Sequence, residues 1–584
     1  MVPPAQRQAE LVPRRSIFKR PACSSSRHPF KRPSASLYPP PGQDLCPSLS
    51  PSAAASVDPQ HGQDLCPSHG EAAGGTAETV TENPVCWEPG SWMDPMSEQP
   101  LDWTRPPRDG PLPQKPAWAL HMVRVLQSKG FLPSERVEKS LELNLWSDCS
   151  GINSDMFALK TLGRAIEDLI GCRVHWSLYF ACDSDSRSLK FADRNHQPKH
   201  TSNGMEWRSF ESGQCWCTKH KQNHDMPRTG VDIYVGTYPC SPWSRRGKRS
   251  GFAHQDARLF MIGIDTISWL APAVWVIEIG EMPSHTDMAE LMDIVCRINT
   301  KGRTTYTIQT MKNLSPAWAG FPIRRSRLFI CGWREDIGQD GVAQPMECLV
   351  GAPMAMDKSY LAFLGIRRQH DWSRVGAYPI AEELAHIRAS GCACGVDPFQ
   401  ICRVHNCKCR RCGEDGLQCT WRGLLAQMIV DQGLEGAARA NAATLSYINV
   451  LELHGSSTPQ HPRQRIFLNL LALRADARPL NDTLLVADLS QNPPHGDVLL
   501  DGELPTLTTS SCLWSFQAGQ ALSVYHLAAM MGLDTTEIAF DTDMTVGWFR
   551  HRLGMAVHIA NFGLALIAVL TPALGPCIGG SRNY

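Results

Sequence analysis

The chain has 584 residues, and 42% of them are hydrophobic, which leaves room for several domains and a sizeable core. Lys plus Arg and Asp plus Glu both number 57, so attraction to an anionic partner must come from local clusters of charge rather than from the net charge. The 22 cysteines, without an apolar signal core at the start, favour a reduced intracellular protein with metal or thiol chemistry over a disulfide-rich secreted one.

Residues 1–115 are rich in Pro, Ser, Gly and Ala and show no sustained periodicity, so we expect a disordered tail. The tail carries three basic pairs, Arg14-Arg15, Lys19-Arg20 and Lys31-Arg32. Such pairs are typical of a nuclear address or of a segment that binds phosphates, and equally of a solvated run of charge.

Residues 116–335 alternate short apolar runs with amphipathic stretches. The runs LELNLW (141–146), VHWSLYFACD (174–183), VDIYVG (231–236), AVWVIEI (273–279), TTYTIQTM (304–311) and SRLFICGW (326–333) predict buried strands. The stretches DMFALKTLGRAIEDLI and MAELMDIVCRI predict helices between them. This alternation predicts a doubly wound α/β sheet, in which ligands bind beyond the C-terminal ends of the strands.

The alternation breaks down over residues 336–504, where we expect an inserted domain. Residues 505–584 resume the earlier pattern with PTLTT, the helical LSVYHLAAMMG and an apolar run at 555–570. That run is too short to span a bilayer and contains His558 and Asn561, so it predicts a buried helix and no membrane segment.

Cys240 follows the strand VDIYVG and lies between Pro239 and Pro242, ahead of the basic, glycine-containing segment Arg245 to Gly251. The prolines restrict the backbone, and nearby cations favour the thiolate, which is the nucleophilic form of cysteine. The alternative is a small buried apolar residue at the end of a strand.

Two further strand ends carry charge. Glu278 lies near the end of a wholly apolar strand, where burial raises the pKa of a carboxylic acid and lets it donate a proton near neutral pH. Arg325 and Arg327 stand two residues apart before the next strand, so both project to one side of an extended segment. The alternatives are a structural ion pair for Glu278 and a solvated sheet edge for the arginines.

The order of these motifs resembles the DNA cytosine-5 methyltransferase family. GTYPCSPWSRRGKRSG is similar to the catalytic loop, VWVIEIG to the Glu-Asn-Val strand and GFPIRRSRLFICG to the Gln-x-Arg-x-Arg motif. SDCSGINSDMFAL and YFACDSDSRSLKFADRNH resemble the first two motifs, and PTLTT and RLGMAVHIANFGLALI the ninth and tenth. The resemblance covers roughly 140–335 and 500–570, and the segment between falls where this family carries its target-recognition domain.

The resemblance implies a Rossmann-like class I methyltransferase sheet that binds S-adenosylmethionine. It implies that Cys240 attacks C6 of a flipped cytosine, that Glu278 assists at N3, and that Arg325 and Arg327 hold the base or a nearby phosphate. Asp183 matches the position that takes the ribose hydroxyls. The implied cofactor-binding residues are Ser150, Gly151, Asn153, Ser154, Asp183 and Pro239.

Several residues differ from the family pattern. The family's amides are replaced by Ser241, Ile279, Ile323 and Met555, and Asn153 and Ser154 stand where paired glycines are usual. We therefore expect a DNA (cytosine-5) methyltransferase, with methylation of tRNA cytosine as the alternative within the enzyme class. An inactive methyltransferase-like fold that binds nucleic acid is the alternative outside it. Nuclear residence is expected from the DNA substrate and the basic pairs.

A cysteine-rich segment lies within the predicted insert. Its eight candidate ligands are Cys392, Cys394, Cys402, His405, Cys407, Cys409, Cys412 and Cys419. Zinc takes four thiolate or imidazole ligands, so eight suit two ions or one shared cluster. The alternatives are unligated thiols or disulfides. The interleaved basic residues suit phosphate contacts and equally a solvated charged face.

Overall fold

The computed structural model describes residues 117–243, 250–280, 285–337, 344–355, 485–490, 500–501, 504–515 and 520–579. The predicted tail (1–115), the basic residues at 244–249 and the zinc ligands predicted at 392–419 lie outside the described residues.

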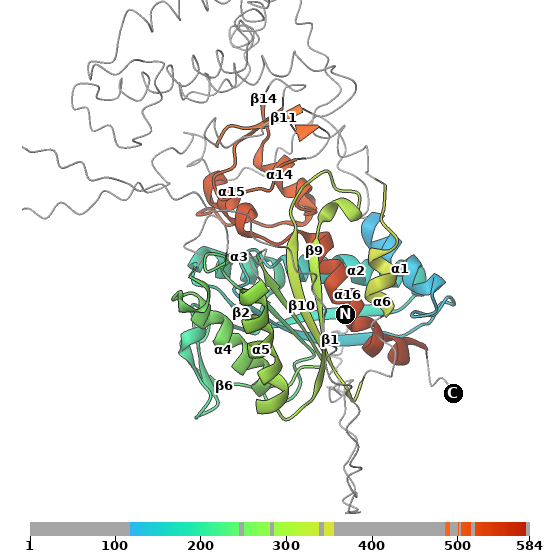
Figure 1. Ribbon diagram of the computed structural model, residues 1–584, viewed down its shortest axis with the longest axis vertical. Helices are drawn as coiled ribbons and strands as arrows, with labels where there is room; N and C mark the ends of the chain where they lie inside the picture. The colour runs from blue at the N-terminus through green and yellow to red at the C-terminus, as the bar shows by residue number, and fades with distance from the viewer. Residues whose placement is uncertain are drawn as a thin grey trace, which may run out of the picture. The chain divides into compact units, whose positions relative to one another are not determined.

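The central element is a seven-stranded sheet with the order β3-β2-β1-β7-β8-β10-β9 (Figure 1). Neighbouring strands pair in parallel from β3 to β8, and β10 runs antiparallel to both β8 and β9. The strands are β1 (Ser140–Asp148), β2 (Arg173–Cys182), β3 (His200–Ser202), β7 (Ile233–Thr237), β8 (Val274–Ile279), β9 (Tyr306–Leu314) and β10 (Arg327–Arg334). Chain order reverses between β1 and β7, which is where a doubly wound sheet binds its ligands.

Helices cover both faces of this sheet, which is why its central strands are apolar on both sides. Every residue of β8 is buried, and so are seven of the eight residues of β10. Two apolar clusters form the core, and α4 and α5 contribute to the one opposite α1, α2 and α16 (Figure 1). The helices are α1 (Ala117–Ser128), α2 (Ser154–Ile170), α3 (Ser186–His196), α4 (Ala257–Leu270), α5 (His285–Lys301) and α6 (Gln344–Val350).

The six apolar runs and both amphipathic stretches predicted between 116 and 335 are strands and helices of this fold, and the predicted α/β fold class is confirmed. The edge strand β3 was not predicted, nor was a small antiparallel sheet made of β4 (Arg208–Ser209), β5 (Gln214–Cys217) and β6 (Gln222–Asp225). These strands have only two to four residues each, too few for the sustained apolar alternation that marks a strand in sequence.

The C-terminal part adds a four-stranded sheet of β11 (Leu485–Asp488), β12 (Leu500–Asp501), β13 (Leu513–Ser515) and β14 (Gln520–Ala521). Helices α14 (Val524–Met530), α15 (Val546–Met555) and α16 (Ile559–Gly579) follow. α16 packs against α2, β8 and β10, so residues far apart in sequence share one core. The division at 336 and 504 into catalytic and inserted parts stays a prediction.

Residues 559–570 of the apolar run predicted as a buried helix form the first half of α16, and their side chains are buried. The first residue of the run, Met555, ends α15, and residues 556–558 link the two helices. No single helix among the described residues is long and apolar enough to cross a membrane. The bent pair formed by α15 and Ile559–Pro572 meets the length and composition criteria together.

Candidate active site

A cavity of about 1800 Å³ lies at the C-terminal ends of β1, β2, β7 and β8. Segments that follow these four strands line it, together with residues 505–509 and the end of α15. The predicted site residues on its wall are Ser150, Gly151, Ser154, Asp183, Pro239, Cys240, Glu278 and Arg327. The folded chain therefore gathers most of the predicted residues around one space.

The turn from β1 to α2 forms one end of the cavity. Its backbone is left-handed at Cys149, Gly151 and Asn153, each with a φ of 52°. Asn153, where the family has glycine, is buried beneath the wall and precedes the first residue of α2. Asparagine tolerates the left-handed conformation better than most side chains, so this replacement keeps the turn.

Asp183 follows β2 and lies against this turn. Its Oδ2 accepts a hydrogen bond from Gly151 N–H at 2.8 Å, and its Oδ1 accepts one from Asp185 N–H at 2.9 Å. Burial raises the pKa of Asp183, although Arg552 and these two N–H groups act in the opposite direction. The fixed carboxylate keeps free lone pairs and can accept hydroxyl protons from a bound sugar.

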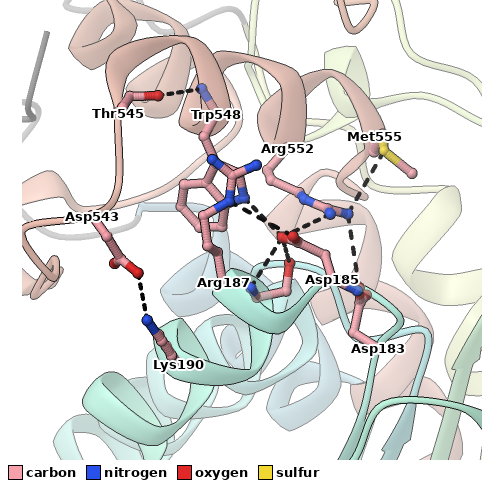
Figure 2. A network of polar contacts seen from close by, with 10 residues as sticks. Asp183, Asp185, Arg187, Lys190, Asp543, Thr545, Trp548, Arg552 and Met555 are labelled. Atoms are coloured by element: carbon pink, nitrogen blue, oxygen red, sulfur yellow. Dashed lines mark hydrogen bonds and ion pairs between the residues drawn. The ribbon is translucent and has the colours of Figure 1, made fainter. Parts of the chain in front are cut away.

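Arg552 of α15 clamps the Asp183 loop (Figure 2). Its Nη2 lies 2.7 Å from Asp185 Oδ2 and its Nη1 3.8 Å from Asp183 Oδ1. Trp548 Nε1 also donates to Asp185 Oδ2, at 2.8 Å. Burial alone would raise the pKa of Asp185, but these contacts hold it below its usual value. Residues more than 350 positions apart thus close this side of the cavity.

Cys240 lies three residues beyond the end of β7 and is exposed to the cavity. Buried hydroxyls fix the chain before it: Tyr238 Oη lies 2.7 Å from Tyr234 Oη, which donates to Asp148 Oδ2 at 2.7 Å. Gly280 follows β8 and approaches so closely that a Cβ there would lie 2.8 Å from Cβ of Cys240. The thiol is therefore held next to the end of the strand that carries Glu278.

Two other cysteines line the same cavity, Cys149 and Cys182. Burial raises the pKa of both thiols well above the usual value for cysteine. They are therefore poor sources of thiolate, and Cys240 is the exposed thiol on this wall among the described residues.

Glu278 and Arg327 lie on the neighbouring strands β8 and β10. Arg327 Nε is 2.9 Å from Glu278 Oε1, and both side chains line the cavity although they are largely buried. Burial raises the pKa of Glu278, and the charges of Arg327 and Arg325 limit the rise. Glu278 is both ion-paired, as the structural alternative supposes, and in reach of a ligand in the cavity.

Arg325 is not where the motif predicted. Its side chain is fully buried and does not line the cavity. Its guanidinium donates to the carbonyls of Leu507 at 2.8 Å and of Gly554 at 2.9 Å, and to that of Ala556. The reason is that this segment lies beneath residues 504–507 and the end of α15, whose free carbonyls need donors. Arg325 joins these segments, so we assign positioning rather than base contact to it.

The replaced amides occupy different environments. Ile279 and Ile323 are completely buried in the apolar core. Ser241 Oγ donates to Asp256 Oδ2 at 2.6 Å and ties the residue after the thiol to the start of α4. Met555 is 53% exposed on the cavity wall.

Several charged residues on the wall were not predicted, among them Asp155, Glu206 and Arg552. Asp155, in the first turn of α2, has its pKa raised to about 6, chiefly by burial. Arg552 carries the clamp described above. Arg552 is the first residue of the stretch RLGMAVHIANFGLALI, which resembles the tenth motif, so the sequence did draw attention to this position. The partners of Arg552, Asp183 and Asp185, could be identified only in the folded chain.

Comparison with known proteins bears on this arrangement. Residues 208–349 match the family model described as C-5 cytosine-specific DNA methylase, and this range contains Cys240, Glu278 and Arg327. The resemblance to the cytosine-5 methyltransferases is thereby confirmed.

Among curated proteins, this chain is similar to the type II methyltransferase M.BsuFI of Bacillus subtilis, to which it is 25% identical over 130 residues. The match covers 22% of this chain and 30% of the Bacillus protein.

Similar solved structures include a DNMT2 variant of Spodoptera frugiperda, with 12% identity, a TM-score of 0.35 and coverage of 73% of this chain and 99% of that one. Dnmt2 of S. pombe has 13% identity, a TM-score of 0.34 and coverage of 74% and 99%. A putative DNA modification methyltransferase from a prophage of E. coli has 18% identity, a TM-score of 0.27 and coverage of 39% and 56%.

Proposed function

We propose that this chain transfers the methyl group of S-adenosylmethionine to C5 of cytosine in DNA. One observation carries the proposal: Cys240, Glu278 and Arg327 line the same cavity as Gly151 and Asp183. A nucleophile, an acid and a cation thus stand at one part of the wall, and a loop suited to a nucleoside cofactor at another.

The donor set fits the cofactor. Asp155, Asp183 and Glu206 put carboxylates on the wall, and these complement a sulfonium cation and ribose hydroxyls. Ser150 Oγ is buried without a hydrogen-bond partner among the described residues, and Ser150 lines the cavity. When bound there, S-adenosylmethionine supplies an electrophilic methyl group.

The proposed methylation of the cytosine base uses Cys240, Glu278 and Arg327. The Cys240 thiolate forms a bond to C6 while the proton of Glu278 moves to N3, so that electron density rises at C5. C5 takes the methyl group, whose former bonding pair stays on the sulfur of the cofactor as a neutral thioether, and C5 then loses its proton to a base. The bond from C6 to sulfur breaks, N3 returns its proton, and Cys240 is again a thiolate. Arg327 pairs with Glu278 through Nε and donates to Ser326 O through Nη1, so its Nη2 is the donor that can reach toward the carbonyl oxygen of the base.

The position of Cys240 on the wall of the cavity supports the proposal that the target base is flipped. A cytosine stacked in a duplex cannot bring C6 to a thiol on an inner wall, so the nucleotide must swing out, which costs a few kcal/mol. The basic residues Arg245, Arg246, Lys248 and Arg249 begin five positions after Cys240 in sequence and are suited to contact the phosphates on either side of the flipped nucleotide.

The test is methyl transfer from labelled S-adenosylmethionine to unmethylated duplex DNA and, in parallel, to tRNA. We expect label in DNA with the natural protein and with Cys296→Ser, a control that alters an exposed thiol on α5. We expect none with Cys240→Ser. Label in tRNA alone would move the assignment to tRNA, and binding without transfer on both substrates would support the inactive fold.

A further inference from the structure

A second group of metal-ligating side chains lies away from the residues that carry the proposed chemistry. Among the described residues, His200, Cys217, His220 and His224 each offer one ligand atom, and these atoms all lie within 4.8 Å of one another. They come from the edge strand β3, from β5, from the turn after it and from β6. We propose that these four residues bind one structural zinc ion.

The fold of this region brings the four together. Thr218 N–H donates to Thr201 O at 2.8 Å, and the Oγ1 atoms of the two threonines lie 2.8 Å apart. These contacts place Cys217 beside His200, although 17 residues separate Thr201 from Thr218. His224 pairs with Cys215 across β5 and β6, which puts the side chain of His224 on the same face of the small sheet as Cys217.

The rings converge as ligands of one ion do. The ring centroids are 5.2 Å apart for His200 and His220, 4.5 Å for His200 and His224, and 4.9 Å for His220 and His224. Cys217 Sγ lies 3.3 Å from His220 Nδ1. Zinc bonds of about 2.0 to 2.3 Å in a tetrahedron separate ligand atoms by about 3.3 to 3.8 Å. The pair formed by Cys217 and His220 already has this spacing, and the widest pairs, which lie within 4.8 Å, need to close by about 1 to 1.5 Å at most.

Burial supports a ligand at the centre. Cys217 is 0% and His200 7% exposed, and His200 Nδ1 has no hydrogen-bond partner among the described residues. The two nearby lysines point to other partners: Lys219 Nζ binds Asp193 Oδ1 at 2.7 Å, and Lys199 Nζ lies 4.9 Å from the centre of the Tyr179 ring. A buried imidazole nitrogen without a donor or acceptor costs free energy that a metal bond removes.

One thiolate and three imidazoles suit zinc better than harder ions such as Mg²⁺ or Ca²⁺. Four protein ligands fill the tetrahedron and leave no open position, which indicates a structural role. Strand β3 connects this site to the proposed active site, because it runs directly into Asn203, Gly204, Met205 and Glu206 on the cavity wall. A zinc ion here would fix that wall by joining β3 to the small sheet.

The experiment measures zinc in the purified full-length protein, together with the spectrum after replacement by Co²⁺. We expect the natural protein to hold one equivalent more zinc than Cys217→Ser. This difference does not depend on zinc bound by cysteines elsewhere in the chain. The difference spectrum should show the charge-transfer band of a thiolate on tetrahedral cobalt. Cys215→Ser alters another buried cysteine of β5 outside the cluster and should keep both signals.

His220→Cys guards against a variant that fails to fold, since His220 is exposed and the new set of two thiolates and two imidazoles still suits zinc. This variant should keep the equivalent of zinc and strengthen the cobalt charge-transfer band. Equal zinc in the natural protein and Cys217→Ser, or a cobalt spectrum that His220→Cys leaves unchanged, would overturn the proposal.

Discussion

Replacing Arg552 should weaken cofactor binding more than any other change at the rim of the cavity. The side chain is 13% exposed and lies 2.7 Å from Asp185 Oδ2, so its charged hydrogen bond is largely shielded from water. Hydrogen bonds to charged groups contribute about 1.5 to 3 kcal/mol. Since about 1.4 kcal/mol is a factor of ten, Arg552→Ala should raise the Kd for S-adenosylmethionine about 10- to 100-fold.

The defect should also depend on pH. Arg552 lowers the pKa of Asp183, which burial has already raised, so its loss raises that pKa further. Asp183 is then protonated over more of the acidic range, and the loss of affinity should be larger at pH 6 than at pH 8. Titration calorimetry with S-adenosylmethionine at both pH values measures this directly.

Arg187→Ala is the matched control for Arg552→Ala. Arg187 approaches the same carboxylate, Asp185, but at 3.7 Å and with 42% of its side chain exposed, so it should change the Kd little. Arg552→Lys keeps the charge without the fork and should fall between the two. Equal effects of Arg187→Ala and Arg552→Ala, or an unchanged Kd in Arg552→Ala, would refute the clamp.

Three further predictions follow from buried charges. The side chains of the ion pair between Arg208 and Asp148 are 1% and 0% exposed. Arg208→Met leaves the buried carboxylate of Asp148 without its partner and should lower the free energy of unfolding, measured in urea, by about 3 to 5 kcal/mol. A loss no larger than that of Arg173→Met, which alters an exposed ion pair, would contradict this. If the protonated form of Glu278 is the acid, kcat should fall as pH rises through its raised pKa, and Glu278→Gln should lose about 10²- to 10⁴-fold in kcat together with that alkaline limb; an unchanged pH profile in the variant would count against the assignment. The folded-state pKa of Asp155 is raised to about 6 from 3.8, so its ionisation opposes folding: Asp155→Asn should stabilise by about 3 kcal/mol at pH 8, with the gain shrinking below pH 6 and gone below about pH 4, and a gain independent of pH would contradict the burial argument.

The sequence predicted the parts of the site that depend on local pattern. Strands buried on both faces, such as β7 and β8, are continuous apolar runs, and the first polar or reactive side chains at or just beyond their C-terminal ends mark the cavity edge. Cys240 and Glu278 could be found in this way. The sequence identified Asn153 as a departure from the family pattern. Why the departure is tolerated became clear only from the structure, where the backbone of Asn153 is left-handed.

Features built from distant segments left no readable signal. The carbonyls that hold Arg325 belong to residues about 180 to 230 positions later, and nothing in GFPIRRSRLFICG indicates that they lie there. The metal-ligating cluster joins His200 to Cys217 and His224 through strands of three or four residues, which are too short to show a sustained apolar period. The sequence therefore directed attention to the cysteine-rich segment 392–419 instead.

The most direct test of the central claim is a covalent adduct between Cys240 and a cytosine ring. Duplex DNA carrying 5-fluorocytosine is incubated with the protein and S-adenosylmethionine, denatured, and analysed by mass spectrometry of the digested peptides. Fluorine cannot leave C5 as the proton does, so the bond from sulfur to C6 should persist, and the adduct should map to Cys240 and be absent in Cys240→Ser. Turnover of ordinary cytosine without any adduct, or an adduct on another cysteine, would contradict the account.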